Sequence, residues 1–154
     1  MKHKLYLVPF SELYLECSYN WLQNPILLRL IDAKPVSLDT QRKWFDSIKN
    51  KPSYYIWGIA CNEYHPVGVC GLKNVSSTEK SGELFCYIGD PNLWGGGLGN
   101  QIIALIKEQA RILGLTSLCL IVLSFNYRAI SLYRKSGYIE IEKDDKSIYM
   151  IKIL

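Results

Sequence analysis

The fold of this chain is decided by the stretch Leu93-Trp94-Gly95-Gly96-Gly97-Leu98-Gly99-Asn100. It follows a strand-like segment, residues 82–89, and it opens a helix-like segment, residues 101–111. A glycine-rich turn that enters a helix exposes free backbone N–H groups at the positive end of the helix dipole. Glycine also permits positive φ angles and a close approach of the backbone to a ligand. The stretch therefore predicts an anion site that suits a phosphate or a pyrophosphate.

Three interpretations of this turn compete. A dinucleotide-binding fingerprint needs G-x-G-x-x-G after the first strand and an acidic residue about 20 residues later. Here the glycines read G-G-G-x-G and lie past the middle of the chain. A P-loop needs Lys and Ser or Thr after its last glycine, whereas Gly99 is followed by Asn100 and Gln101. The third interpretation is a turn without any ligand, and the turn by itself does not exclude it.

A second motif lies downstream and reads Asn126-Tyr127-Arg128-Ala129-Ile130-Ser131-Leu132-Tyr133-Arg134-Lys135-Ser136-Gly137-Tyr138. In this order the two motifs resemble those of the GCN5-related N-acetyltransferase (GNAT) superfamily. Its pyrophosphate loop reads Gln/Arg-x-x-Gly-x-Gly/Ala, and its later segment reads Asn-x-x-Ala-x-x-Leu-Tyr-x-x-x-Gly-Phe/Tyr. Gly97 and Gly99 fill the small positions, whereas Trp94 departs from Gln or Arg in a way that resembles the ribosomal-protein and spermidine acetyltransferase branch. The resemblance covers roughly residues 5–150.

Apolar periodicity and turn signals predict alternating strands and helices. Strands are expected at 4–9, 54–61, 66–73, 83–88, 117–123, 138–142 and 147–153, and helices at 12–22, 26–32, 38–48, 97–112 and 128–135. Ser11 and Ser37 are predicted N-caps, and residues 62–65 are a predicted turn. The continuous apolar run 117–123 predicts a strand that is buried on both faces. The resemblance implies an α/β fold with a mixed, mostly antiparallel sheet of six to seven strands, flanked by helices and splayed between its fourth and fifth strands.

Composition limits the functional classes. A chain of 154 residues predicts a single acetyltransferase domain over 1–154. The net charge is +4 without a dense basic run, so nucleic acid is not an expected partner. The five cysteines form no C-x-x-C pair, which predicts free thiols in a reducing compartment and no metal site. No apolar segment has the length of a signal peptide or a membrane span. We therefore expect a cytoplasmic monomer or homodimer that acts on small molecules.

The resemblance implies acetyl-CoA as co-substrate, and it assigns cofactor-binding residues. These are Tyr87, Ile88, Trp94, Gly95, Gly96, Gly97, Leu98, Gly99, Asn100 and Asn126. Backbone N–H groups of residues 95–100 would hold the pyrophosphate, and the strand near Tyr87 and Ile88 would pair with the pantetheine arm as a peptide pairs with a sheet edge. The Asn126 amide could hydrogen-bond the same arm. The alternative for Asn126 is an ordinary turn residue at a strand end.

Two residues are candidates for proton transfer. Tyr133 occupies the family's general-acid position, where a phenol protonates the departing thiolate. The alternative is an aromatic side chain that only packs. Glu83 begins the fourth predicted strand, where several relatives carry a Glu that faces the acceptor amine, and it could take a proton directly or through a water. The alternative is a solvated carboxylate at a strand end. His3 and His65 lie in a terminus and a turn and are not expected to be catalytic.

The N-terminal third would contact the acceptor. Trp21, Asn24 and Arg29, followed by Trp44-Phe45, resemble the pattern of enzymes that acetylate ribosomal protein termini, spermidine or amino sugars on nucleotides. The alternative is that Trp21, Trp44 and Phe45 are buried anchors of two helices. The guanidinium of Arg29 suits a phosphate or a carboxylate, which favours an amino sugar attached to a nucleotide. The alternatives are a ribosomal-protein N-terminus, a polyamine, or a non-catalytic CoA-binding module on the same fold.

Overall fold

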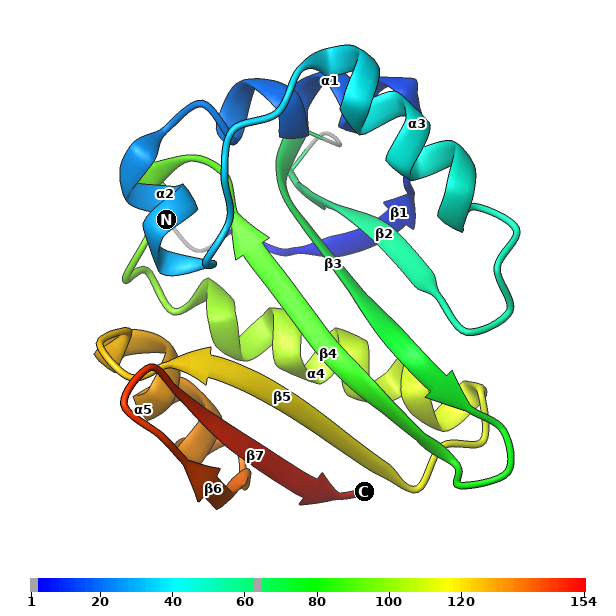
Figure 1. Cartoon of the computed structure of the whole chain (residues 1–154), viewed down its shortest axis with the longest axis vertical. Helices are drawn as coiled ribbons and strands as arrows, with labels where there is room; N and C mark the ends of the chain where they lie inside the picture. The colour runs from blue at the N-terminus through cyan, green and yellow to red at the C-terminus, as the bar shows by residue number, and fades with distance from the viewer. Residues whose placement is uncertain (1–2, 63–64) are drawn as a thin grey trace.

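The structure is a computed structural model that describes residues 3–62 and 65–154. Its centre is a seven-stranded sheet in the order β1-β2-β3-β4-β5-β7-β6 (Figure 1). The strands are β1 Tyr6–Pro9, β2 Tyr55–Cys61, β3 His65–Ser76, β4 Ser81–Ile88, β5 Ser117–Leu123, β6 Ile139–Lys143 and β7 Ser147–Ile153. The neighbours β4 and β5 are parallel, and the other paired strands run antiparallel. The predicted mixed sheet is confirmed; the predicted turn 62–65 includes residues 63–64, which lie outside the described residues.

Helix boundaries follow the local capping chemistry. The helices are α1 Glu12–Trp21, α2 Pro25–Leu30, α3 Leu38–Ile48, α4 Leu98–Ile112 and α5 Tyr127–Lys135, with a short 3₁₀ turn, η2, at Pro91–Leu93. Ser37 caps α3 as predicted, because its hydroxyl accepts from the N–H of Thr40 at 3.1 Å. Ser11 stands at the N-cap of α1 as predicted, but its hydroxyl does not make the expected capping bond. Asn24 caps α2 instead of merely ending α1.

The helices cover the sheet in two layers. Figure 1 shows α1 and α3 over the β1–β4 part of one face, with α4 behind the sheet. Because side chains alternate along a strand, Phe85 and Tyr87 of β4 join the cluster beneath α1, whereas Leu84 joins the main core with Ile102 and Ile106 of α4. The sheet therefore separates two apolar layers, and β4 contributes to both.

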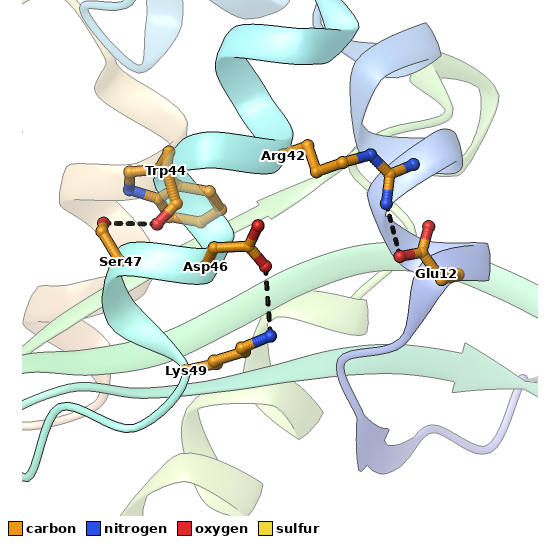
Figure 2. A network of polar contacts seen from close by, with 6 residues as sticks. All are labelled: Glu12, Arg42, Trp44, Asp46, Ser47 and Lys49. Atoms are coloured by element: carbon orange, nitrogen blue, oxygen red, sulfur yellow. Dashed lines mark hydrogen bonds and ion pairs between the residues drawn. The ribbon is translucent and has the colours of Figure 1, made fainter.

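Aromatic contacts, more than surface ion pairs, hold α3 in place. Figure 2 shows Arg42 of α3 paired with Glu12 of α1, and further polar contacts within α3. Such exposed pairs contribute little to stability. The rings carry more: Phe45 lies 4.9 Å from Phe10, and Trp44 meets Phe10 edge-on at 6.4 Å. Phe45 is therefore a partly buried anchor of α3, as the second of the two explanations holds, whereas Trp44 is 38% exposed and is not a buried anchor.

The sheet opens between β4 and β5. The two strands pair only over Ser81–Glu83 and Ser117–Cys119, and Figure 1 shows their C-terminal ends well apart. This confirms the predicted splay. The prediction that β5 is buried on both faces was wrong, because Ile121 is 59% exposed while Leu120 is buried. Helices cover only one face of this part of the sheet.

No helix of the described chain combines the length and the apolar character that crossing a bilayer requires.

Candidate active site

A cavity of about 700 Å³ lies where β4 and β5 separate. Its walls come from α2, the end of β4, the glycine-rich loop with the start of α4, the segment after β5, and α5. Among the lining residues are Cys86, Tyr87, Ile88, Trp94, Gly95, Gly97, Leu98, Gly99, Asn100, Asn126, Arg128, Tyr133 and Lys135. The fold thus brings both sequence motifs to one cavity although about 30 residues separate them in the chain.

Three of the four glycines in the loop are required, each for its own reason. Gly95 and Gly97 have φ angles of 77° and 81°, in the left-handed region that other residues rarely adopt. Gly97 is the N-cap of α4, and a Cβ there would meet nothing within 4 Å. A Cβ on Gly99 would lie 2.6 Å from the Leu132 side chain, so Gly99 permits the contact between α4 and α5. The space above Gly97 lets an anion reach the free N–H groups of the first turn.

Trp94 fastens the loop to the sheet. Its indole Nε1 donates to the carbonyl oxygen of Ile88 at 2.8 Å. Trp94 stands where the family pattern has Gln or Arg, and it makes this hydrogen bond within the protein. It also lines the cavity. This bond sets the distance between the loop and the end of β4.

The open edge of β4 presents backbone groups that β5 does not pair, and one of them, the Ile88 carbonyl, already accepts from the Trp94 indole. The Gly89 N–H donates to the Val67 carbonyl at 2.8 Å, and Tyr87 pairs with Val69. Because hydrogen-bonded pairs alternate in an antiparallel ladder, the polar backbone groups of Tyr87 face β3, whereas those of Cys86 and Ile88 face the gap beside β5. The backbone of Ile88 thus lies at the predicted pantetheine edge, but that of Tyr87 does not. The Tyr87 side chain lies on the face covered by α1.

Tyr133 lies at the inner end of the cavity. Its hydroxyl is 3.9 Å from the Sγ of Cys86, and its ring meets Tyr138 at 5.8 Å. Burial raises the pKa of Tyr133 well above its usual value of 10, and raises the pKa of the Cys86 thiol to about 11. Both groups therefore keep their protons at neutral pH. A phenol held protonated beside a strand edge is suited to donate a proton.

Asn126 lines the cavity, but its amide already has protein partners. The Oδ1 accepts from the N–H of Ala129 at 3.3 Å and so caps α5, while the Nδ2 donates to the Leu30 carbonyl at 3.5 Å. This second bond joins α2 to the segment after β5 across the opening. These two bonds support the alternative explanation, in which Asn126 is a structural residue after a strand. Its contact with the cofactor stays a prediction.

Glu83 is not among the residues that line this cavity. It lies where β4 still pairs with β5, opposite Cys119. Its carboxylate contacts the Lys73 Nζ at 3.4 Å and accepts from the Asn74 Nδ2 at 3.1 Å. The three residues of extended strand from Glu83 to Cys86 span about 10 Å. The structure therefore does not bring Glu83 beside Tyr133.

None of the three predicted acceptor residues lines the cavity, and each has a contact within the protein. The Trp21 ring covers Gly89, since a Cβ there would lie 2.0 Å from its Cδ2. The Asn24 Oδ1 accepts from the N–H of Ile26 at 2.9 Å. The Arg29 guanidinium lies over the ring of Phe125, 4.9 Å from its centroid. Phe125 lines the cavity, so Arg29 reaches its rim.

Among the cavity residues that reasoning from the sequence missed, two make contacts that matter for the site. Cys86 is the residue beside the Tyr133 hydroxyl. Strand alternation from Glu83 could have placed it on the opposite face of β4, but only the structure shows what lies there. Arg128 lies inside the second motif, and its guanidinium carbon would be 3.6 Å from a Cβ on Gly95. Its charge was visible, but its contact with a loop 33 residues earlier was not.

The residues of the cavity fit acetyl-CoA. The left-handed glycines and the open space above Gly97 suit a pyrophosphate, and the free edge of β4 suits an extended amide-bearing arm. A family model described as an acetyltransferase (GNAT) domain matches residues 4–139.

Solved structures share this architecture. Spermidine N-acetyltransferase from Vibrio cholerae, in complex with CoA and spermine, superposes with a TM-score of 0.88 at 19% identity, covering 97% of this chain and 95% of that one. A domain from Methanocaldococcus jannaschii gives 0.85 at 19% identity, covering 99% and 100%. The uncharacterized protein MJ1062 of the same organism is 23% identical over 142 residues, which are 90% of this chain but 29% of that protein. Because the family model covers most of its length, the chain belongs to the acetyltransferase (GNAT) family.

Proposed function

We propose that this domain transfers the acetyl group of acetyl-CoA to a primary amine on a small anionic molecule, an amino sugar attached to a nucleotide. The observation that carries acetyl transfer is the buried, protonated Tyr133 hydroxyl at the inner end of the cavity, beside Cys86 on the free edge of β4. The glycine-rich loop opens the same cavity toward a pyrophosphate.

The roles of the residues follow from this placement. Bound acetyl-CoA supplies the acetyl group as a thioester. Free N–H groups on the edge of β4 polarise its carbonyl, and the Tyr133 hydroxyl gives its proton to the departing thiolate sulfur. The amine nitrogen forms the new C–N bond as the C–S bond of the thioester breaks. The nitrogen loses one proton, the thiolate sulfur gains one from Tyr133, and solvent returns a proton to Tyr133.

Glu83 is proposed to accept the amine proton through water, because β4 holds it too far from the reaction centre for direct contact. Lys73 and Asn74 hold its carboxylate in place. Replacement Glu83→Gln should lower kcat at neutral pH. A kcat equal to that of the wild type would remove Glu83 from the reaction.

Charge favours an anionic acceptor. Arg29 lies at the rim of the cavity and forms no ion pair within the described residues. Glu12, Asp32 and Asp39 are each paired with a cation, whereas Glu16 of α1 and Asp90 after β4 form no ion pair within the described residues. The free guanidinium of Arg29 suits a phosphate, and the two free carboxylates keep a polyamine as an alternative.

A polyamine is the second candidate, because the Vibrio cholerae spermidine N-acetyltransferase is a structural relative. A panel of acceptors decides between them. The purified protein is incubated with acetyl-CoA and a nucleotide-linked amino sugar, spermidine, a free amino acid or a ribosomal N-terminal peptide, and CoA release and product mass are measured. We expect the amino sugar to give the highest kcat/KM. Preference for spermidine or a peptide would refute the anionic acceptor, and failure to bind acetyl-CoA at millimolar concentration would refute acetyl transfer itself.

A further inference from the structure

An ion pair joins the end of α2 to the far side of the cavity opening. Asp32 follows α2, and its Oδ2 lies 2.9 Å from the Lys146 Nζ in the turn between β6 and β7. Beside this pair, the Asn126 Nδ2 donates to the Leu30 carbonyl at 3.5 Å. Both contacts connect α2, which forms one wall of the cavity, with segments that follow β5. The end of α2 is thus fastened across the gap between β4 and β5.

Asp32 occupies a backbone position that favours glycine. Its φ angle is 55°, and it directly follows Ile31, the C-cap of α2. The N–H of Ala33 donates to the Leu28 carbonyl at 2.9 Å, as in the Schellman motif that ends many helices. Glycine is the usual residue at this point, and the negative end of the helix dipole disfavours a carboxylate there. The backbone therefore does not explain the aspartate, whereas its bond to Lys146 does.

The turn that carries Lys146 is held from two sides. The Asp144 Oδ1 accepts from the N–H groups of Lys146 and Ser147, both at 2.8 Å. The Lys146 carbonyl accepts from the Ser124 N–H at 2.9 Å, which ties the turn to the residue after β5. The ion pair therefore connects Asp32 to a fixed point of the fold.

Arg29 is the residue that this connection would place. Leu27 and Leu28 are buried and anchor the middle of α2, whereas residues 32–37 are all exposed. Arg29 precedes Asp32 by three residues, and its guanidinium lies over the Phe125 ring at the cavity rim. Fixing the end of α2 therefore also fixes where the guanidinium stands.

We propose that Asp32 and Lys146 are positioning residues, whose ion pair fastens the end of α2 across the opening and holds Arg29 at the rim of the cavity. The pair acts through α2 and touches no reacting group. This inference rests on the proposed anionic acceptor, which Arg29 would bind.

Hydrogen–deuterium exchange tests the fastening without any substrate. Asp32→Asn keeps the shape of the side chain and tolerates the left-handed backbone, but it removes the charge. We expect the N–H groups of residues 31–33 to exchange about two- to fivefold faster, which matches the strength of an exposed ion pair. Lys146→Gln should give the same increase, and the double variant no further increase. Asp39→Asn is the matched control, because it breaks another exposed pair, with Lys43 on α3.

Steady-state kinetics with a nucleotide-linked amino sugar test the positioning of Arg29. Asp32→Asn should raise the KM for this acceptor about two- to fivefold and leave kcat and the Kd of acetyl-CoA unchanged. The same substitution should not change that KM when Arg29 is already replaced by Gln. Asp32→Gly should also raise the KM without lowering the free energy of unfolding, because glycine suits this backbone.

The two measurements keep the possible failures apart. Exchange of residues 31–33 in Asp32→Asn that equals exchange in Asp39→Asn would overturn the fastening. Faster exchange with an unchanged acceptor KM would overturn the positioning of Arg29. A wild type that acetylates no anionic acceptor would contradict the proposed function and with it the positioning role, and the exchange rates would still decide whether the ion pair fastens α2.

Discussion

Two walls of the cavity are built on different principles. The cofactor wall comprises residues 94–100, α4 and α5, and the proposed acceptor wall comprises α1 and α2, of which only α2 contributes residues that line the cavity. The cofactor wall presents backbone N–H groups and two glycines with left-handed backbone conformation. Within the protein these features only form the turn. On the acceptor wall, Trp21, Asn24 and Arg29 each have a contact inside the protein. The backbone geometry of the cofactor wall thus points to a ligand directly. The side chains of the acceptor wall do not, because contacts within the protein already explain their positions.

The largest effect is expected at the end of the cofactor wall. Tyr133→Phe removes the hydroxyl next to Cys86 and should lower kcat by about 10²-fold while leaving acetyl-CoA affinity nearly unchanged. Tyr138→Phe is the matched control, because it removes another buried hydroxyl from the ring that Tyr133 contacts. Steady-state kinetics and calorimetry give the two quantities. Equal turnover in the two variants would assign the proton to another group or to water.

The next effect separates ligand binding from backbone strain. Gly97 and Gly114 have φ angles of 81° and 79°, and a Cβ on either would meet nothing within 4 Å. Gly97→Ala and Gly114→Ala should therefore cost a similar stability, about 1 kcal/mol each. Only Gly97→Ala should also weaken CoA, by about tenfold, because its methyl group occupies the space above the loop. Equal CoA affinities in both variants would show that the loop does not touch the pyrophosphate.

A smaller effect is expected on the acceptor wall. Arg29→Gln should raise the KM for an anionic acceptor about three- to tenfold and leave the KM for acetyl-CoA unchanged. Arg42→Gln is the control, since Arg42 is exposed and pairs with Glu12 away from the cavity. The measurement is initial rate against each substrate in turn, at low and high salt. An unchanged acceptor KM would leave Arg29 with its contact to Phe125 alone.

The smallest effect concerns the stability of the acceptor wall at high pH. Burial raises the pKa of Tyr14 in α1 from its usual value of 10 to about 12. Between these values the unfolded chain releases the proton and the native state keeps it, so the free energy of unfolding falls as the pH rises from 10 to 12. The Tyr14 hydroxyl is buried without a partner among the described residues.

Tyr14→Phe should therefore be neutral or slightly stabilising at pH 8 and should flatten this alkaline loss. Urea unfolding at pH 8 and pH 11 measures both. A variant that is clearly less stable at pH 8 would mean that the hydroxyl has a partner. A slope identical to that of the wild type would mean that Tyr14 titrates as it does in the unfolded chain.

The sequence by itself determined the order of the elements, the family and the cofactor loop. Glycines before a helix, Ser37 before another, and alternating apolar residues are local signals, and local geometry decides their structure. The pairing of the two motifs also predicted that residues 97–99 and Tyr133 serve one site. The structure places them around one cavity, as that interpretation requires.

Only the tertiary structure decided which groups face that cavity. Strand pairing turns the backbone of Ile88, and not that of Tyr87, toward the open edge. One face of β5 is exposed at Ile121 because the helices pack against the other face. Cys86 beside Tyr133 and Arg128 on Gly95 are contacts between segments far apart in the chain. Such contacts depend on how layers pack, since the side chains of β4 alternate between two layers, and no local pattern in the sequence records the partner across the gap.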